Sequence, residues 1–279
     1  MLPIKKIYVD SRFKTADSAS DTDFKIDLPG SFLMPENTAM YITDVTIPVS
    51  WYTVDEKKNN LIYYYVLREV PLTDASGNVV KDAQGQGVMT YVWTKVTGHL
   101  SPGDYNLVTL AGAMQAAMNT GMSGMGTFTV TASMLTNRIT ITNDTRNFRI
   151  FTDAELPAQG WTAPYYSINT MIQNDTAYDA DLIFMTGYVN LFPNRNLYIV
   201  SPNLGKFDTM SVSGERKILK KVPVNAGYNE MIYDQTILAN DFIDCSRQLL
   251  GRLEFQLKDL YGNVMNLNGN YWSCSLLFA

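Results

Sequence analysis

Residues 247–279 read RQLLGRLEFQLKDLYGNVMNLNGNYWSCSLLFA and contain the pattern that decides the fold. Apolar and polar residues alternate through Leu253–Leu257, and a period of two is typical of a strand with one buried face. The turn sequence DLYGN at 259–263 separates this strand from a second apolar run, Tyr271–Phe278. A strand so near the terminus is held by neighbours in a sheet, so we expect a β-sandwich whose last strand is central or needed for closure.

The composition bounds the size and class of the protein. With 279 residues, 46% of them hydrophobic, the chain can form one large all-β domain or two modest ones. Only 18% of the residues are charged, while 17 are tyrosine and 12 phenylalanine, a balance that suits a surface covered by partners. The net charge of −5 argues against a main surface that binds nucleic acid. No apolar run approaches the ~18 residues of a membrane span, and the N-terminus shows no secretory segment, so we expect synthesis and assembly in a cytoplasm-like compartment.

Short strand patterns separated by turn residues occupy most of the chain, and this favours a sandwich or barrel. The predicted strand Leu61–Leu67 contains three consecutive tyrosines. Tyr63 and Tyr65 lie on one face of this strand and Tyr64 on the other. Residues 74–87, rich in glycine and polar residues, predict an exposed, mobile hairpin tip. We expect strands at 4–10, 23–28, 38–48, 61–67, 88–96, 182–189, 196–200, 216–223, 230–233, 250–258 and 270–278.

The middle of the chain has a different pattern. Leu107–Asn119 is the one convincing helix, because apolar residues recur along it at helical spacing, and Asp104 or Asn106 can cap its start. Three short strands are expected after it, at 127–131, 138–142 and 147–151, with a further short helix at 165–173. We therefore predict a β-sandwich body formed by 1–90 and 174–279, and a small α+β subdomain at 91–173. The sequence leaves open whether this subdomain is inserted into the sandwich or stands beside it.

Residues suited to catalysis or metal binding are scarce. His99 is the single histidine, which excludes a His-based zinc cluster, and no nucleophile motif surrounds any serine or cysteine. There is no Walker loop and no glycine-rich dinucleotide motif, and the loop at 74–82 lacks the bidentate Glu of the usual calcium loop. We therefore predict no catalytic residue, no cofactor and no metal. A hydrolase built on a carboxylate pair stays as an alternative, which would need two acids in one deep pocket with a raised pKa.

Two further features have an ordinary structural interpretation. Cys245 and Cys274 are too few for a disulfide scaffold, and we interpret them as small buried hydrophobic residues, although the two could pair in space. The basic residues of 216–221 are interpreted as a solvated strand edge rather than a phosphate-binding patch, because charged edges also prevent sheets from pairing at random.

Four aromatic residues outside the clearest strands are candidates for an interaction surface: Trp51, Tyr52, Trp161 and Tyr165. If these side chains are exposed, an attachment module could bind a receptor or a glycan through them. The simpler interpretation of Trp51 and Tyr52 is that they pack beneath a loop as it crosses the sandwich. If the four side chains lie buried, the attachment hypothesis loses its motive.

Several short motifs spread over the chain resemble those of virion proteins from eukaryotic DNA viruses. The motifs are IYVDSR at 7–12, DF at 23–24, LP at 28–29, IP at 47–48, WYTV at 51–54, NNL at 59–61, PGDY at 102–105 with Ala111, Met114, Met118 and Asn119, FQLKD at 255–259, GN at 262–263, LNG at 267–269 and WS at 272–273. Together they resemble the minor capsid or penton-type proteins of polinton-like viruses, virophages and related large DNA viruses.

This resemblance implies a jelly-roll-like antiparallel β-sandwich with no catalytic site. It implies a structural subunit, penton or other minor capsid protein, that assembles through lateral sandwich faces into a homo-oligomer, a pentamer if it is a penton. The partners expected are other copies of the chain and the major capsid protein, and the place expected is the virion, after synthesis in the host cytoplasm or a viral factory. The alternative is a receptor- or glycan-binding attachment or adaptor module on the virion surface. Loops such as 11–23 and 74–87 are natural contact points in either case.

Overall fold

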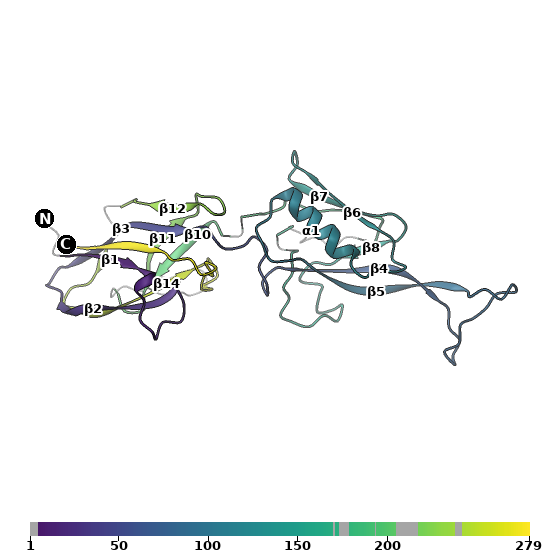
Figure 1. The fold of residues 1–279 in the computed structure, drawn as a ribbon, viewed down its shortest axis with the longest axis horizontal. Helices are drawn as coiled ribbons and strands as arrows, with labels where there is room; N and C mark the ends of the chain where they lie inside the picture. The colour runs from purple at the N-terminus through teal and green to yellow at the C-terminus, as the bar shows by residue number, and fades with distance from the viewer. Residues whose placement is uncertain (1–4, 170, 173–178, 193, 205–216, 238–241) are drawn as a thin grey trace. The chain divides into compact units, whose positions relative to one another are not determined.

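A computed structural model of the chain describes residues 5–169, 171–172, 179–192, 194–204, 217–237 and 242–279 (Figure 1). The chain divides into two compact units, Met1–Trp51 with Asn194–Ala279, and Tyr52–Pro193. Because the first unit is made of two separate segments, the second unit is an insertion into it. The insertion begins before the predicted residue 91, because the strands on either side of residue 90 pair as one hairpin within it. It ends at Pro193, after the predicted residue 173.

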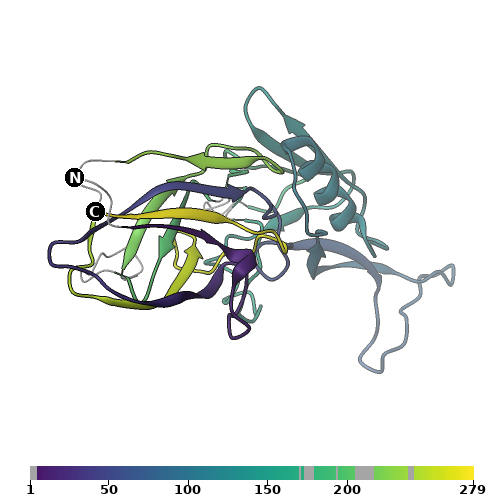
Figure 2. The same ribbon diagram turned by 60° about the vertical axis from the view of Figure 1, so that its left-hand side comes forward.

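The first unit is a sandwich of two antiparallel sheets (Figure 2). One sheet has the order β1-β15-β3-β12, formed by β1 (Lys5–Asp10), β15 (Ser273–Phe278), β3 (Ala39–Pro48) and β12 (Met231–Asp234), with the short β13 (Ile243–Asp244) also paired to β3. The other sheet has the order β11-β10-β14-β2, formed by β11 (Ile218–Pro223), β10 (Asn196–Val200), β14 (Leu249–Lys258) and β2 (Asp23–Leu33). A single 3₁₀ turn, η1 (Ser11–Phe13), follows β1.

This strand order is that of a jelly roll. When β1, β2, β3, β10, β11, β12, β14 and β15 are lettered B to I in chain order, the two sheets read B-I-D-G and F-E-H-C. Each sheet takes strands from both ends of the chain, as two interlocked Greek keys require. The predicted jelly-roll-like sandwich is therefore confirmed, and the second unit is inserted between β3 and β10, the D and E strands.

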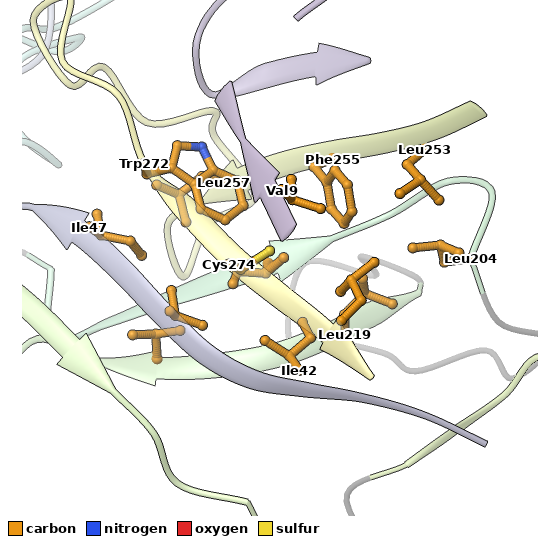
Figure 3. Close-up of a cluster of buried hydrophobic side chains, with 14 of the residues drawn as sticks. Val9, Ile42, Ile47, Leu204, Leu219, Leu253, Phe255, Leu257, Trp272 and Cys274 are labelled. Carbon is orange, nitrogen blue, oxygen red and sulfur yellow. The ribbon is translucent and has the colours of Figure 1, made fainter. Parts of the chain in front are cut away.

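The core of the jelly roll lies between the two sheets (Figure 3). Leu253, Phe255 and Leu257, the apolar residues of the alternating stretch, are all fully buried there. Trp272 packs edge-on against Phe24, with ring centroids 5.6 Å apart. The period-two pattern thus marks the inward face of β14 as predicted.

Both cysteines lie in this core as buried thiols and form no disulfide. Burial raises the pKa of the Cys274 thiol, because the apolar surroundings disfavour the thiolate. The interpretation of Cys245 and Cys274 as small buried hydrophobic residues is confirmed.

The second unit packs one helix against β-sheet. Its strands are β4 (Leu61–Pro71), β5 (Met89–His99), β6 (Phe128–Ser133), β7 (Arg138–Asn143), β8 (Phe148–Ile150) and β9 (Ile183–Met185), arranged as β5-β4-β8 and β6-β7-β9. A bridge between Phe148 and Asp181 joins the two sets of strands. β9 is shorter than the strand predicted at 182–189. The helix predicted at 165–173 is wrong over its described residues, because Ser167 forms a β-bridge with Leu61 instead. Residues 170 and 173 lie outside the described residues.

The helix α1 (Leu107–Asn119) forms where predicted. Asn106 caps it, accepting from the backbone N–H of Thr109 at 2.9 Å while the Thr109 hydroxyl accepts from the Asn106 N–H at 2.9 Å. Met114 and Met118 are fully buried against the sheet, which confirms that the apolar stripe packs in a core. A Cβ at Gly98 would lie 2.8 Å from the Ile62 side chain of β4 and 3.3 Å from the Ala117 carbonyl oxygen of α1, so this glycine lets β5 approach the helix closely.

The tip of the β4–β5 hairpin consists of two tight hairpins of its own, beyond the part of the sheet that α1 covers (Figure 1). DASGN at 74–78 and DAQGQ at 82–86 share one design: the aspartate accepts two backbone N–H groups, and the glycine has a positive φ. DLYGN at 259–263 repeats it. Hydrogen bonds from backbone N–H groups hold the pKa of Asp74 below its usual range. The Asp74 carboxylate thus stabilises its own turn.

Leu276 and Leu277, neighbours on β15, test the orientation of this strand. Leu276 is fully buried between the sheets, whereas Leu277 is half-buried on the outer face. We expect Leu276→Ala to lower the free energy of unfolding of the jelly roll by about 2–5 kcal/mol, because it leaves a cavity in the core. Leu277→Ala should cost below about 1 kcal/mol. Urea unfolding followed by fluorescence and far-UV circular dichroism measures both, and equal losses would contradict the assigned orientation.

Candidate interaction surfaces

The outer face of the β1-β15-β3-β12 sheet carries large exposed apolar residues at both edges. Tyr8 on β1 is 76% exposed, and Tyr233 on β12 is 66% exposed, with Met231 beside it. The row of Tyr233 runs through Thr46 and Ser273 to Asp10, and Tyr8 lies opposite Ser275, which pairs with Asp44. The centre of this face is therefore polar, the β12 edge carries Met231 and Tyr233, and the β1 edge carries Tyr8 between Lys6 and Asp10.

A shallow groove of ≈ 350 Å³ lies at one end of this face. It is lined by Asp10, Arg12, Thr46, Pro48, Met231, Asn270, Tyr271, Trp272 and Ser273. The Arg12 Nε donates to Asp10 at 3.0 Å, and this hydrogen bond lowers the pKa of the Asp10 carboxyl. The two charges in the groove thus neutralise each other and leave a surface suited to an uncharged contact.

The opposite outer face, on β2 and β14, carries ion pairs. Arg252 lies 2.6 Å from Asp27 and 3.0 Å from Asp17, which also pairs with Lys25 at 3.2 Å. Hydrogen bonds from Thr15 and Lys25 lower the pKa of Asp17 to about 2. Exposed pairs of this kind add little to stability but keep a face well hydrated. At the other end of the same two strands, Leu33 and Leu249 lie opposite each other and are 70% and 65% exposed, so this face is charged over only part of its length.

The interpretation of the basic cluster as a solvated edge is wrong for Lys220. Its ammonium is only 5% exposed, lies 3.3 Å from the Asp234 carboxylate and donates to the Thr236 carbonyl at 2.8 Å. The reason is strand alternation: Lys220 shares the inward face of β11 with Val222, whereas Lys221 points outward. Residue 216 lies outside the described residues.

The four predicted aromatic residues are half-buried, Trp51 in the first unit and the other three in the second. In the first unit, Trp51 is half-buried against the jelly-roll core. In the second unit, Tyr52 is also half-buried, and Trp161 packs edge-on against Tyr63 with ring centroids 5.4 Å apart. The structure therefore gives these side chains packing positions instead of an open face.

Trp161 and Tyr165 belong to one small cluster on the second unit. The Trp161 Nε1 donates to the Thr97 hydroxyl at 3.1 Å, and the Tyr165 hydroxyl donates to the Trp161 carbonyl at 3.2 Å. The Lys95 ammonium lies 4.5 Å from the Trp161 ring centroid, a cation–π contact. The polar atoms and one ring face of this cluster are thus occupied from within the unit.

Sequence reasoning missed the aromatic residues that are exposed. Tyr91 and Trp93 on β5 are 54% and 47% exposed, and Met89 is 47% exposed. The signal was present, because these three residues alternate within a predicted strand and so share one face. On β1 and β12, nothing local separates an outward tyrosine from an inward one.

The described residues contain no arrangement that suggests catalysis. They include no group of three His, Cys, Asp or Glu side chains placed to hold a metal, and His99 is exposed at the end of β5. The carboxyl pKa values that shift there, those of Asp10, Asp17, Asp74 and Asp144, are all lowered, because each carboxylate accepts hydrogen bonds. A hydrolytic carboxylate pair would need the opposite shift. No helix among the described residues is long and apolar enough to cross a membrane.

Comparison with known proteins gives structural likenesses but no sequence match. No family model matches the chain, and no curated protein matches it. The crystal structure of SeMet-labelled mavirus penton protein is similar to this chain, with a TM-score of 0.49 and 10% sequence identity, covering 98% of this chain and 99% of that chain. The jelly-roll assignment rests on the strand order of this chain itself, and the likeness carries no residue's role across.

Lys220 and Asp234 allow a test of the buried ion pair. We expect Lys220→Met or Asp234→Leu alone to cost about 3–5 kcal/mol of unfolding free energy, because each leaves one buried charge without its partner. The double variant should regain most of that loss, since two apolar side chains can pack where the pair was. Urea unfolding of the four proteins measures the coupling, and strictly additive losses would show that the two charges do not interact.

Proposed function

We propose that this chain is a structural virion protein, a penton or another minor capsid subunit, without catalytic activity. The observation that carries the proposal is the jelly roll whose β1-β15-β3-β12 sheet exposes Tyr8, Met231 and Tyr233 on its outer face. Interfaces that persist are enriched in tyrosine and methionine and poor in charge. The resemblance of the sequence motifs to penton-type proteins supports the same role.

Exposed tyrosines on both edge strands favour a ring. Tyr8 lies on β1 and Tyr233 on β12, which are the two edge strands of one sheet. A contact in which the β1 edge of one copy meets the β12 edge of the next joins two different surfaces, and such head-to-tail contacts form a ring when the rotation closes. In a penton the ring contains five copies. The major capsid protein is the second partner in this proposal, the virion the place of function, and the host cytoplasm or viral factory the place of synthesis.

An attachment role through the four predicted aromatic residues has less support. Trp51 packs on the jelly-roll core, and the polar atoms of Trp161 and Tyr165 have partners inside the second unit. A receptor or glycan would have to displace these contacts before it could stack on the rings.

Tyr233→Asp tests the proposed ring. The wild-type protein is expected to form a discrete oligomer larger than a dimer at high concentration, measured by light scattering. A carboxylate at position 233 would be desolvated in the contact, so the variant should shift to smaller species. Tyr8→Asp, at the opposite edge of the sheet, should do the same.

Tyr261→Asp is the matched control, because Tyr261 is 72% exposed but lies in the turn between β14 and β15. It should leave the oligomer intact. A wild-type protein that stays monomeric at every concentration, or a control that dissociates as readily as Tyr233→Asp, would contradict the proposed contact.

A further inference from the structure

β5 leaves one long edge of the second unit's sheet without a neighbour among the described residues. It pairs with β4 in an unbroken register, from Leu61 opposite His99 to Pro71 opposite Met89. The odd-numbered residues of β4 turn their backbone groups away from β5; the Leu67 N–H, for example, donates to the Asn147 carbonyl at 3.0 Å. In an antiparallel pair, residues directly opposite each other turn the same way with respect to the shared ladder. The odd-numbered residues of β5 therefore turn their N–H and C=O groups to the free edge.

The other outer strand of this unit, β6, is protected by contrast. Gln115 of α1 accepts from the Val130 N–H at 2.9 Å. Asn119 of α1 accepts from the Phe128 N–H and donates to the Phe128 carbonyl, both at 2.8 Å. Helix side chains thus occupy the edge where another strand could pair. β5 has no such cover, and it contains neither a proline nor a bulge.

The free edge of β5 is also apolar. Met89, Tyr91 and Trp93 are each about half exposed and lie on one face of the strand, and Val92 on the other face is 43% exposed. A long, regular, apolar edge is a template for another strand, and main-chain hydrogen bonds supply much of the affinity in such pairing. This edge is therefore a docking surface for an extended segment.

We propose that β5 pairs antiparallel with β5 of a second copy of this chain, about a two-fold axis at Trp93. This inference goes beyond the proposed ring, because it uses the inserted unit instead of the jelly roll. The pairing makes one continuous sheet of both hairpins and places Met89 of each copy opposite Thr97 of the other. It is an isologous contact, in which the same surface serves both copies.

An axis at Trp93 is one of the registers that keep odd-numbered residues opposite odd-numbered ones, and cross-linking separates it from its neighbours. An axis at Thr94 would let Thr94→Cys cross-link with itself, and an axis at Val92 would let Val92→Cys cross-link with itself.

Lys95 is the one Asp, Glu, Lys or Arg residue in β5, and centring the pair on Trp93 places it opposite Tyr91 of the second copy. Within each copy Arg146 pairs with Glu69 and lies 4.8 Å from the Tyr91 ring centroid, and the Lys95 ammonium lies 4.5 Å from the Trp161 ring centroid. These charges are balanced inside the unit, so the pairing of two β5 edges brings no unpaired charge into the contact. Centring on Lys95 would instead oppose two ammonium groups. Centring on Tyr91 would extend the pairing into residues 85–88, which belong to the hairpin tip.

Disulfide formation between two single-cysteine variants tests both partner and register. In this pairing Val92 of one copy forms a non-hydrogen-bonded pair with Thr94 of the other, whose Cα atoms lie ~4.5 Å apart, within the ~4.4–6.8 Å that a disulfide spans. Val92→Cys and Thr94→Cys are co-expressed with different tags and oxidised gently. We expect a disulfide that joins the two tags, and little cross-linking of either variant alone, because identical positions sit on the ~7–8 Å diagonal.

Thr90→Cys replaces Thr94→Cys as the matched control, since residue 90 faces Val96 in this register. Cys245 and Cys274 are buried and add little background. Trp93→Lys should abolish the cross-link by bringing two positive charges together at the axis. Equal cross-linking of Val92→Cys with itself, equal cross-linking with Thr90→Cys, or no cross-link in any mixture would overturn the proposal.

The same variants separate this contact from the proposed ring. Tyr233→Asp should leave the β5 cross-link in place, and Trp93→Lys should leave the ring-sized oligomer in light scattering. A ring without the cross-link refutes only the β5 pairing, while a cross-link in a protein that never forms the ring refutes only the ring.

Discussion

β15 lies between β1 and β3, and the rest of the jelly roll depends on this position. In the sheet order β1-β15-β3-β12, β1 has β15 as its only neighbour along the path, so removal of β15 would detach β1 from its sheet. Just before β15, Trp272 packs against both Phe24 and Phe255, which belong to the opposite sheet. One strand thus ties the first strand to the third and joins the two sheets through the core.

This constraint also explains how the fold accommodates an insertion. The jelly roll is closed by pairings between its N- and C-terminal parts, and none of these pairings involves the connection between β3 and β10. A whole α+β unit can therefore occupy that connection without breaking a ladder. β1 and β12 are the two edge strands of this sheet, and each carries an exposed tyrosine on the outer face. Two different edges of one sheet can meet in a head-to-tail contact.

The local sequence pattern was sufficient to predict most strands and the helix, but it did not show which strands pair with each other. Alternation placed Tyr64 on the face toward α1 and Tyr63 and Tyr65 on the face toward Trp161, and the Asn106 cap was among the predicted ones. The boundary of the insertion was misplaced because β4 reads as an ordinary strand, and nothing within it says that β5 and β8 are its partners. Lys220 was misread for the same reason, since its counter-charge, Asp234, lies on another strand. The exposed tyrosines were missed because the inward or outward direction of a strand residue depends on the sheet opposite it.

The central claim is that the outer face of the β1-β15-β3-β12 sheet is covered when copies of the chain assemble. Hydroxyl-radical labelling of tyrosine, read by mass spectrometry on the assembled and the diluted protein, measures this directly. The account predicts that Tyr8 and Tyr233 lose reactivity on assembly while Tyr261, equally exposed in the turn before β15, keeps it. Unchanged reactivity of Tyr8 and Tyr233 in a protein that does assemble would contradict the account, because the contact would then lie on another face.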